Sequence, residues 1–127
     1  MQWPALFAAL CISALPALVR FVYYPGYLGT DDSFIHAAII ESLRTGNGWG
    51  INPGEPVNLS TSPLFTLLML AISWVVPDVM LAGSRLATAA AVFGVFGTFV
   101  IARRMSGNAA VALVAIAIAA TNVHLWR

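Results

Sequence analysis

Two adjacent carboxylates, Asp31 and Asp32, are the residues of this sequence whose types and spacing are best suited to chemistry. They lie at the start of a polar stretch that separates two strongly apolar segments. Acidic side chains are costly to hold at a membrane boundary, so their presence there usually reflects chemistry or ion handling. One aspartate is explained as the N-cap of a following helix. The second needs another reason, and two neighbouring carboxylates can hold a divalent cation or accept a proton from a nucleophile.

A histidine, His36, follows Asp32 at a spacing of one helical turn. Side chains four residues apart lie on the same face of a helix, so His36 and Asp32 can reach one point in space. The pair is a candidate metal site, and Mg²⁺ or Mn²⁺ is the cation that we associate with it. The alternative is a histidine without a ligand that is packed in the interior or lies at the membrane interface.

The composition of the chain indicates an integral membrane protein. It is 60% hydrophobic and 9% charged, whereas a soluble domain carries about a quarter charged residues to cover its surface. The net charge of +1 and the lack of a basic run give no indication of a nucleic-acid partner. Cys11 is the only cysteine, so the sequence excludes an intrachain disulfide.

Four apolar segments predict four membrane-spanning helices, so the expected fold class is an all-α polytopic membrane helix bundle that forms a single domain. The expected spans are residues 3–22, 63–77, 79–102 and 109–126. The second span starts after a capping residue, Ser62, with Pro63 at the first helical position. It is short, because a spanning helix needs about 20 residues. A cleaved signal peptide is the alternative for the first segment, although no Lys or Arg precedes its apolar core.

Residues 23–62 form the expected external loop, and an amphipathic helix is predicted inside it at residues 33–45, directly after the two aspartates. Apolar side chains recur at helical spacing on one face of this helix, and polar side chains occupy the other face. The apolar set is Ile35, Ile39, Ile40 and Leu43, and the polar set is Glu41, Arg44 and Thr45. Such a helix is expected to lie flat in the membrane interface.

The distribution of the arginine residues conflicts with a cytosolic N-terminus. A cytosolic N-terminus combined with four spans places more arginines outside than inside. The outside set is Arg20, Arg44, Arg103 and Arg104, and the inside set is Arg85 and Arg127. The positive-inside rule favours the opposite arrangement.

Several spaced elements occur here in a familiar order. They are an apolar helix, Asp31-Asp32-Ser33-Phe34-Ile35, an amphipathic helix, Gly46-Asn47-Gly48-Trp49, Asn52-Pro53-Gly54-Glu55-Pro56-Val57 and Ser60-Thr61-Ser62-Pro63-Leu64. This order resembles the N-terminal part of the GT-C-type membrane glycosyltransferases. The resemblance is to the polyprenyl-phosphate-sugar-dependent branch, which includes protein mannosyltransferases and bacterial cell-envelope arabinosyl- and mannosyltransferases. The chain departs from that pattern at Asn58, where relatives often have an acidic residue.

The resemblance implies transfer of a sugar from a polyprenyl-phosphate carrier to an acceptor on the non-cytosolic face of a bacterial inner membrane. It implies that Asp31 is the general base for the acceptor hydroxyl, with inversion at the anomeric carbon. It assigns Asp32 to a divalent cation or to orienting the acceptor. It implies substrate-binding roles for Arg103, Arg104 and Glu55, with the two arginines on the lipid phosphate. Anchoring to lipid headgroups is the alternative for both arginines.

Members of that family are usually several hundred residues long, and later helices build their donor site. We therefore expect the chain to be the N-terminal part of a larger or split enzyme, to need a C-terminal companion segment, and to be inactive alone. The alternative is a small multipass membrane protein without enzymatic activity that binds a cation or a partner through its acidic loop. A truncated remnant whose loop has no role is a further alternative.

Overall fold

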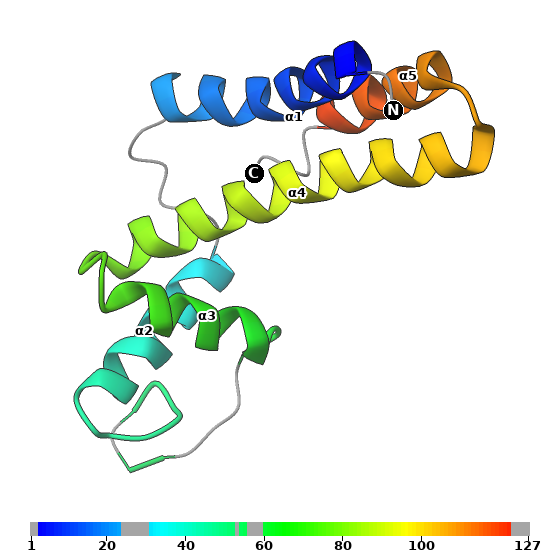
Figure 1. Cartoon of the computed structure of the whole chain (residues 1–127). Helices are drawn as coiled ribbons and strands as arrows, with labels where there is room; N and C mark the ends of the chain where they lie inside the picture. The colour runs from blue at the N-terminus through cyan, green and yellow to red at the C-terminus, as the bar shows by residue number, and fades with distance from the viewer. Residues whose placement is uncertain (1–2, 24–30, 53, 56–59, 123–127) are drawn as a thin grey trace. The chain divides into compact units, whose positions relative to one another are not determined.

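A computed structural model describes residues 3–23, 31–52, 54–55 and 60–122 of the chain. This part is all-α and contains five helices and no strand (Figure 1). The helices are α1 (Trp3–Tyr23), α2 (Asp31–Arg44), α3 (Pro63–Ser73), α4 (Val79–Ser106) and α5 (Ala109–Ala120). The chain divides into two compact units. One unit comprises Met1–Pro25 with Ala87–Arg127, and the other is Gly26–Leu86.

The first unit, formed by the chain's two ends, holds α1, α5 and most of α4 around a small apolar core. Its buried members come from all three helices and are Ala9, Val95, Phe99, Ala112, Ile116 and Ala120. Half of them are alanines, and small side chains let helix backbones approach closely. Gly107, at a φ of 67°, ends α4, and the Asn108 side chain caps α5 by accepting a hydrogen bond from the backbone N–H of Ala110 at 2.9 Å.

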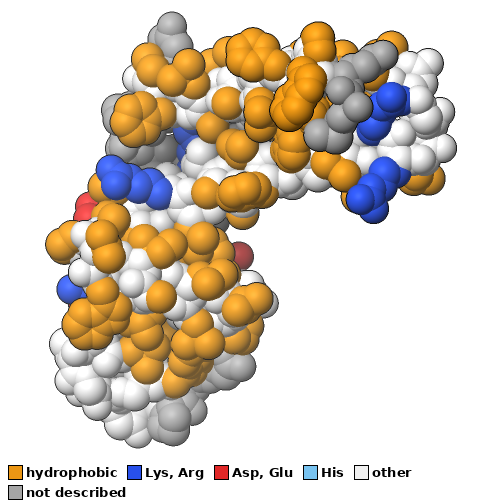
Figure 2. All heavy atoms as spheres, in the orientation of Figure 1, with side chains coloured by type: hydrophobic (Ala, Val, Ile, Leu, Met, Phe, Trp, Pro, Cys, Tyr) orange, Lys and Arg blue, Asp and Glu red, His pale blue; other side chains and the backbone are white. Residues whose placement is uncertain are grey.

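Two helices, α1 and α4, are long and apolar enough to cross a membrane. Only 11% of the most apolar stretch of each is buried, whereas the core helix of a soluble protein is mostly buried. Hydrophobic side chains cover much of the visible surface of the molecule (Figure 2). The exposed ones on these two helices include Phe7, Leu10, Leu18, Phe93 and Ile101. Large exposed apolar patches indicate contact with a membrane or a partner protein.

The other two expected spans form shorter helices. α3 has 11 residues and α5 has 12, which gives each a length of about 16–18 Å at 1.5 Å per residue. The hydrocarbon core of a bilayer is about 30 Å thick. The described helices α3 and α5 are therefore too short to cross it alone, and four spans remain a prediction.

The second unit, residues 26–86, packs α2 on α3 and on the start of α4. Its apolar core is centred on Ile40, Met69 and Val79. Gly83 lets α4 approach α3, because a Cβ atom at this position would lie 2.5 Å from the terminal methyl group of Met69. At the other end of the unit, Arg44 donates a hydrogen bond to the carbonyl of Pro77 at 3.3 Å, which joins the end of α2 to the connection between α3 and α4.

The helix boundaries differ from the sequence prediction at several ends, and the largest difference is that α5 ends at Ala120 rather than at residue 126. α2 begins at Asp31 rather than at residue 33, so the acidic pair is part of the helix and does not precede it. α3 ends at Ser73. α4 continues to Ser106, about one turn beyond the expected end at residue 102. The longer α4 follows from Arg103 and Arg104, which are good helix formers and sit favourably at a helix C-terminus.

Candidate functional site

The acidic pair occupies the first turn of α2, where unpaired backbone N–H groups and the helix dipole favour negative charge. The Asp32 side chain is exposed, while that of Asp31 lies outside the described side chains. A carboxylate in this place is held by a rigid element and faces solvent. Both properties suit a group that must meet a substrate.

One turn after Asp32, a buried polar cluster joins α2 to α3. The Nδ1 atom of His36 lies 2.7 Å from the hydroxyl oxygen of Thr66. The same Thr66 oxygen lies 2.9 Å from the hydroxyl oxygen of Ser60, which is itself 3.5 Å from His36 Nδ1. All three side chains are at least 91% buried. An unsatisfied polar group here would be costly, so the cluster fixes how α2 sits on α3.

The two ring nitrogens of His36 have different environments. Nδ1 either accepts from the Thr66 hydroxyl or donates to it, and in the second case the Thr66 hydrogen goes to the Ser62 carbonyl at 3.3 Å or to Ser60. Nε2 has no hydrogen-bond partner among the described residues. No buried side-chain nitrogen or oxygen in that part of the chain lacks a partner. His36 is thus a packed histidine whose described hydrogen bonds all involve Nδ1.

The local sequence explains why this cluster forms. Pro63 starts α3, because its fixed φ suits the first helical position and its missing N–H is not needed there. That start places Thr66 one turn into the helix, where its side chain bonds back to the Ser62 carbonyl. Phe65, which is also on α3, packs against the His36 ring of α2 in an edge-on arrangement, with ring centroids 5.5 Å apart.

The described side chains do not form a complete metal cage. No three His, Cys, Asp or Glu side chains gather among them. Mg²⁺ prefers oxygen ligands and often uses one or two carboxylates together with waters and substrate phosphates. The chemistry of the acidic pair suits such a hydrated ion, whereas the nitrogen of His36 suits Mn²⁺ better than Mg²⁺. A metal at Asp32 and His36 stays a prediction.

Glu55, a predicted substrate-binding residue, is exposed in the loop between α2 and α3. Its carboxylate accepts a hydrogen bond from the Asn52 side-chain amide at 3.0 Å, and its backbone N–H donates to the Asn52 carbonyl at 3.2 Å. Gly50 packs directly against the Glu55 backbone, where a Cβ atom would not fit. The described contacts of Glu55 therefore hold a tight turn.

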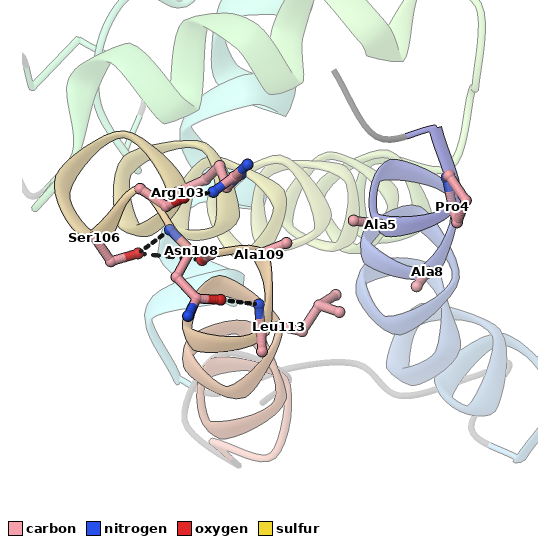
Figure 3. A pocket seen from close by; sticks show the side chains of 10 residues that line it. Pro4, Ala5, Ala8, Arg103, Ser106, Asn108, Ala109 and Leu113 are labelled. Carbon is pink, nitrogen blue, oxygen red and sulfur yellow. Dashed lines mark hydrogen bonds between the residues drawn. The ribbon is translucent and has the colours of Figure 1, made fainter.

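The other predicted substrate-binding residues, Arg103 and Arg104, lie in the last turn of α4, in the unit formed by the chain's ends. Arg103 lines an open pocket of about 660 Å³ between the start of α1 and the α4–α5 corner (Figure 3). Its guanidinium donates to the carbonyl of Gly107. Arg104 is exposed.

No protein-family model matches the chain, and no curated protein or solved structure matches it either. The site must therefore be interpreted from its own geometry. The structure brings Asp32 and His36 onto one helix, as their spacing predicts. Sequence reasoning missed Ser60 and Thr66, which complete the buried cluster. Their signal was a run of hydroxyl residues beside a helix start, which helix capping alone explains equally well.

Proposed function

We propose that the chain is the N-terminal part of an integral-membrane glycosyltransferase that moves a sugar from a polyprenyl-phosphate carrier to an acceptor hydroxyl. The observation that carries the proposal is the position of the acidic pair. Asp32 is exposed in the first turn of α2, and α2 is fixed to α3 by the buried His36, Thr66 and Ser60 cluster. Catalytic groups need such support, because small displacements cost large factors in rate.

The proposed chemistry is a single displacement. The Asp31 carboxylate accepts the proton of the acceptor hydroxyl while the oxygen attacks C1 of the sugar. The bond from C1 to the phosphate oxygen breaks, and the lipid phosphate leaves with the electron pair, which inverts the anomeric centre. A positioned carboxylate base contributes typically 10²–10⁴-fold to such a step. Asp32 orients the acceptor or holds a hydrated divalent cation.

The proposed location is the bacterial inner membrane, with the acidic loop on its outer face. α1 and α4 supply the membrane spans, in keeping with their length and their low burial. α1 has no charged residue before Arg20, and α4 has none between Arg85 and Arg103. At 1.5 Å per residue, residues 3–19 and 86–102 each extend about 25 Å, which is close to the hydrocarbon thickness, and these three arginines can extend to the headgroups.

The test is transfer of radiolabelled sugar from polyprenyl-phosphate donors in membranes. The chain alone is compared with a version extended by downstream coding sequence. We expect activity in the extended protein, a loss of at least 10²-fold in Asp31→Asn, and retained activity in the control Glu41→Gln. Glu41 is an exposed carboxylate at the other end of α2, paired with Arg44 at 3.3 Å.

Two outcomes would contradict the proposal. One is equal activity in Asp31→Asn and in the unchanged protein. The other is no transfer in either length of chain, combined with binding of a divalent cation or a protein that depends on the acidic pair. That second result would favour a non-enzymatic membrane protein.

A further inference from the structure

Charge is segregated between the two units. All five carboxylates of the chain lie in the unit Gly26–Leu86: Asp31, Asp32, Glu41, Glu55 and Asp78. The unit formed by the chain's ends contains no acidic residue, yet it carries Arg20, Arg103 and Arg104 among its described residues. A cation in that unit therefore has no carboxylate of its own unit to pair with. An anion that pairs with such a cation therefore comes from outside the unit.

Two arginines of this unit, which has no acidic residue, lie at the corner between α4 and α5. Arg103 lines the pocket and Arg104 follows it in the chain. The Gly107 carbonyl takes one N–H group of Arg103, and a guanidinium has five. Several donors thus stay available in a fork that matches phosphate. Arg104 has no ion-pair partner among the described residues.

The pocket wall is divided into apolar and polar parts (Figure 3). Pro4, Ala5 and Ala8 from the start of α1 and Leu113 from α5 supply the apolar side. Ser106 and Asn108 supply polar groups beside Arg103. An apolar wall next to an arginine matches a ligand that has both a hydrocarbon chain and an anionic head.

The pocket also lies at the ends of both proposed spans. The first turns of α1 and the last turn of α4 line it together, so these two helices run antiparallel and bring these ends to one end of their unit (Figure 1). If both helices cross the bilayer, this end lies at headgroup level. Trp3, which is 75% exposed and adjoins Pro4, is an interface anchor of the expected type.

We propose that the pocket formed by α1, α4 and α5 binds the phosphate headgroup of an anionic phospholipid through Arg103, with Arg104 adding positive charge in the same turn of α4. The occupant is a lipid of the leaflet on the N-terminal side of the membrane. The inference uses the two membrane spans of the proposed function but not its chemistry. It replaces the substrate role of these arginines. In the proposed topology, α1 crosses the bilayer between the pocket and the acidic pair, so the arginines cannot bind the same substrate as the aspartates.

The test uses Trp3 as a local probe. The full chain, with its other three tryptophans changed to phenylalanine, is reconstituted into phosphatidylcholine vesicles. These contain equal fractions of either brominated phosphatidylglycerol or brominated phosphatidylcholine, since bromine quenches tryptophan on contact. We expect stronger quenching by the brominated anionic lipid. Arg103→Gln together with Arg104→Gln abolishes the difference, and Arg103→Lys with Arg104→Lys restores it by keeping the charge.

Arg85→Gln is the matched control, because Arg85 is an exposed arginine near the opposite end of α4. It leaves the difference intact. Equal quenching by the two lipids in the unchanged protein overturns the proposal, and so does a difference that survives the double glutamine variant. Quenching by neither lipid means that the helices are not inserted, which refutes the spans rather than the enzymatic chemistry.

Discussion

At the residue scale, the Thr66 hydroxyl is the centre of the buried polar cluster. Its oxygen contacts His36, Ser60 and the Ser62 carbonyl, and the side chain is fully buried. Thr66→Val keeps the volume but removes the shorter hydrogen bonds of the buried His36 and Ser60 side chains, which keep only their mutual contact of 3.5 Å. We expect a loss of about 1–3 kcal/mol in the free energy of unfolding, measured by thermal unfolding in detergent micelles.

The control for this prediction is the same change in a protein that already carries His36→Leu. Replacing both partners of a hydrogen bond by apolar groups is nearly neutral in many cases, whereas removing one partner is not. Thr66→Val should therefore cost less in that background, where only Ser60 loses a partner. An equal cost in both backgrounds would mean that the contact between His36 and Thr66 contributes nothing to the stability of the unit.

The sequence predicted only part of the candidate site. Asp32 and His36 were identifiable because their residue types and spacing imply one face of one helix. The alternative of a packed histidine describes His36 well, since it is 6% exposed. Thr66 was not identifiable, because its partner His36 is 30 residues away in the chain. Local patterns cannot predict such a pairing, which depends on how α2 packs against α3.

At the element scale, the close approach of α3 and α4 depends on Gly83. Gly83→Ala displaces only the flexible end of Met69 and gains about 1 kcal/mol of helix propensity, so we expect little net change in stability. Gly83→Ile overfills the contact and should cost about 1–3 kcal/mol. Thermal unfolding of both variants in detergent measures the difference.

Gly94 supplies the control for Gly83, because it lies on the same helix and a Cβ atom there meets nothing within 4 Å. Gly94→Ile should leave the unfolding temperature close to that of the unchanged protein. If Gly83→Ile and Gly94→Ile have equal effects, the contact between α3 and α4 is not close in solution.

Helix types were easier to predict than helix ends. Apolar runs predicted where α3 and α5 begin, and Pro63 correctly indicated the start of α3, although the Ser62 side chain makes no capping hydrogen bond. The prediction placed the start of α2 two residues too late, because an aspartate serves equally well as a cap or as a first-turn residue. The end of α4 was placed too early, because arginines were taken to mark the end of a span although they also extend helices.

At the scale of the whole molecule, the antiparallel arrangement of α1 and α4 bears on the orientation problem of the arginines. If these two helices alone cross the bilayer, Arg103 and Arg104 lie on the same side as the N-terminus. The connection between these two spans, residues 24–78, then begins and ends on the other side of the membrane from the N-terminus. With a cytosolic N-terminus, Arg103 and Arg104 move inside while Arg85 moves outside, so three arginines lie on each side instead of four outside and two inside. The arrangement therefore reduces the conflict with the positive-inside rule.

Cysteine accessibility tests this arrangement directly. In a Cys11→Ala background, single cysteines are introduced by Gln2→Cys at the N-terminus, Ser106→Cys at the α4–α5 corner and Thr45→Cys after α2. Intact cells or sealed vesicles are treated with a membrane-impermeant maleimide. We expect Gln2→Cys and Ser106→Cys to react from one face and Thr45→Cys from the other.

Four spans predict instead that Ser106→Cys and Thr45→Cys share a face, because two further crossings separate them. That result would mean that α3 crosses the membrane and that the start of α1 and the end of α4 lie on opposite faces, which excludes the pocket that they line together. Arg103 and Arg104 would then again be candidates for binding the lipid phosphate of the sugar donor.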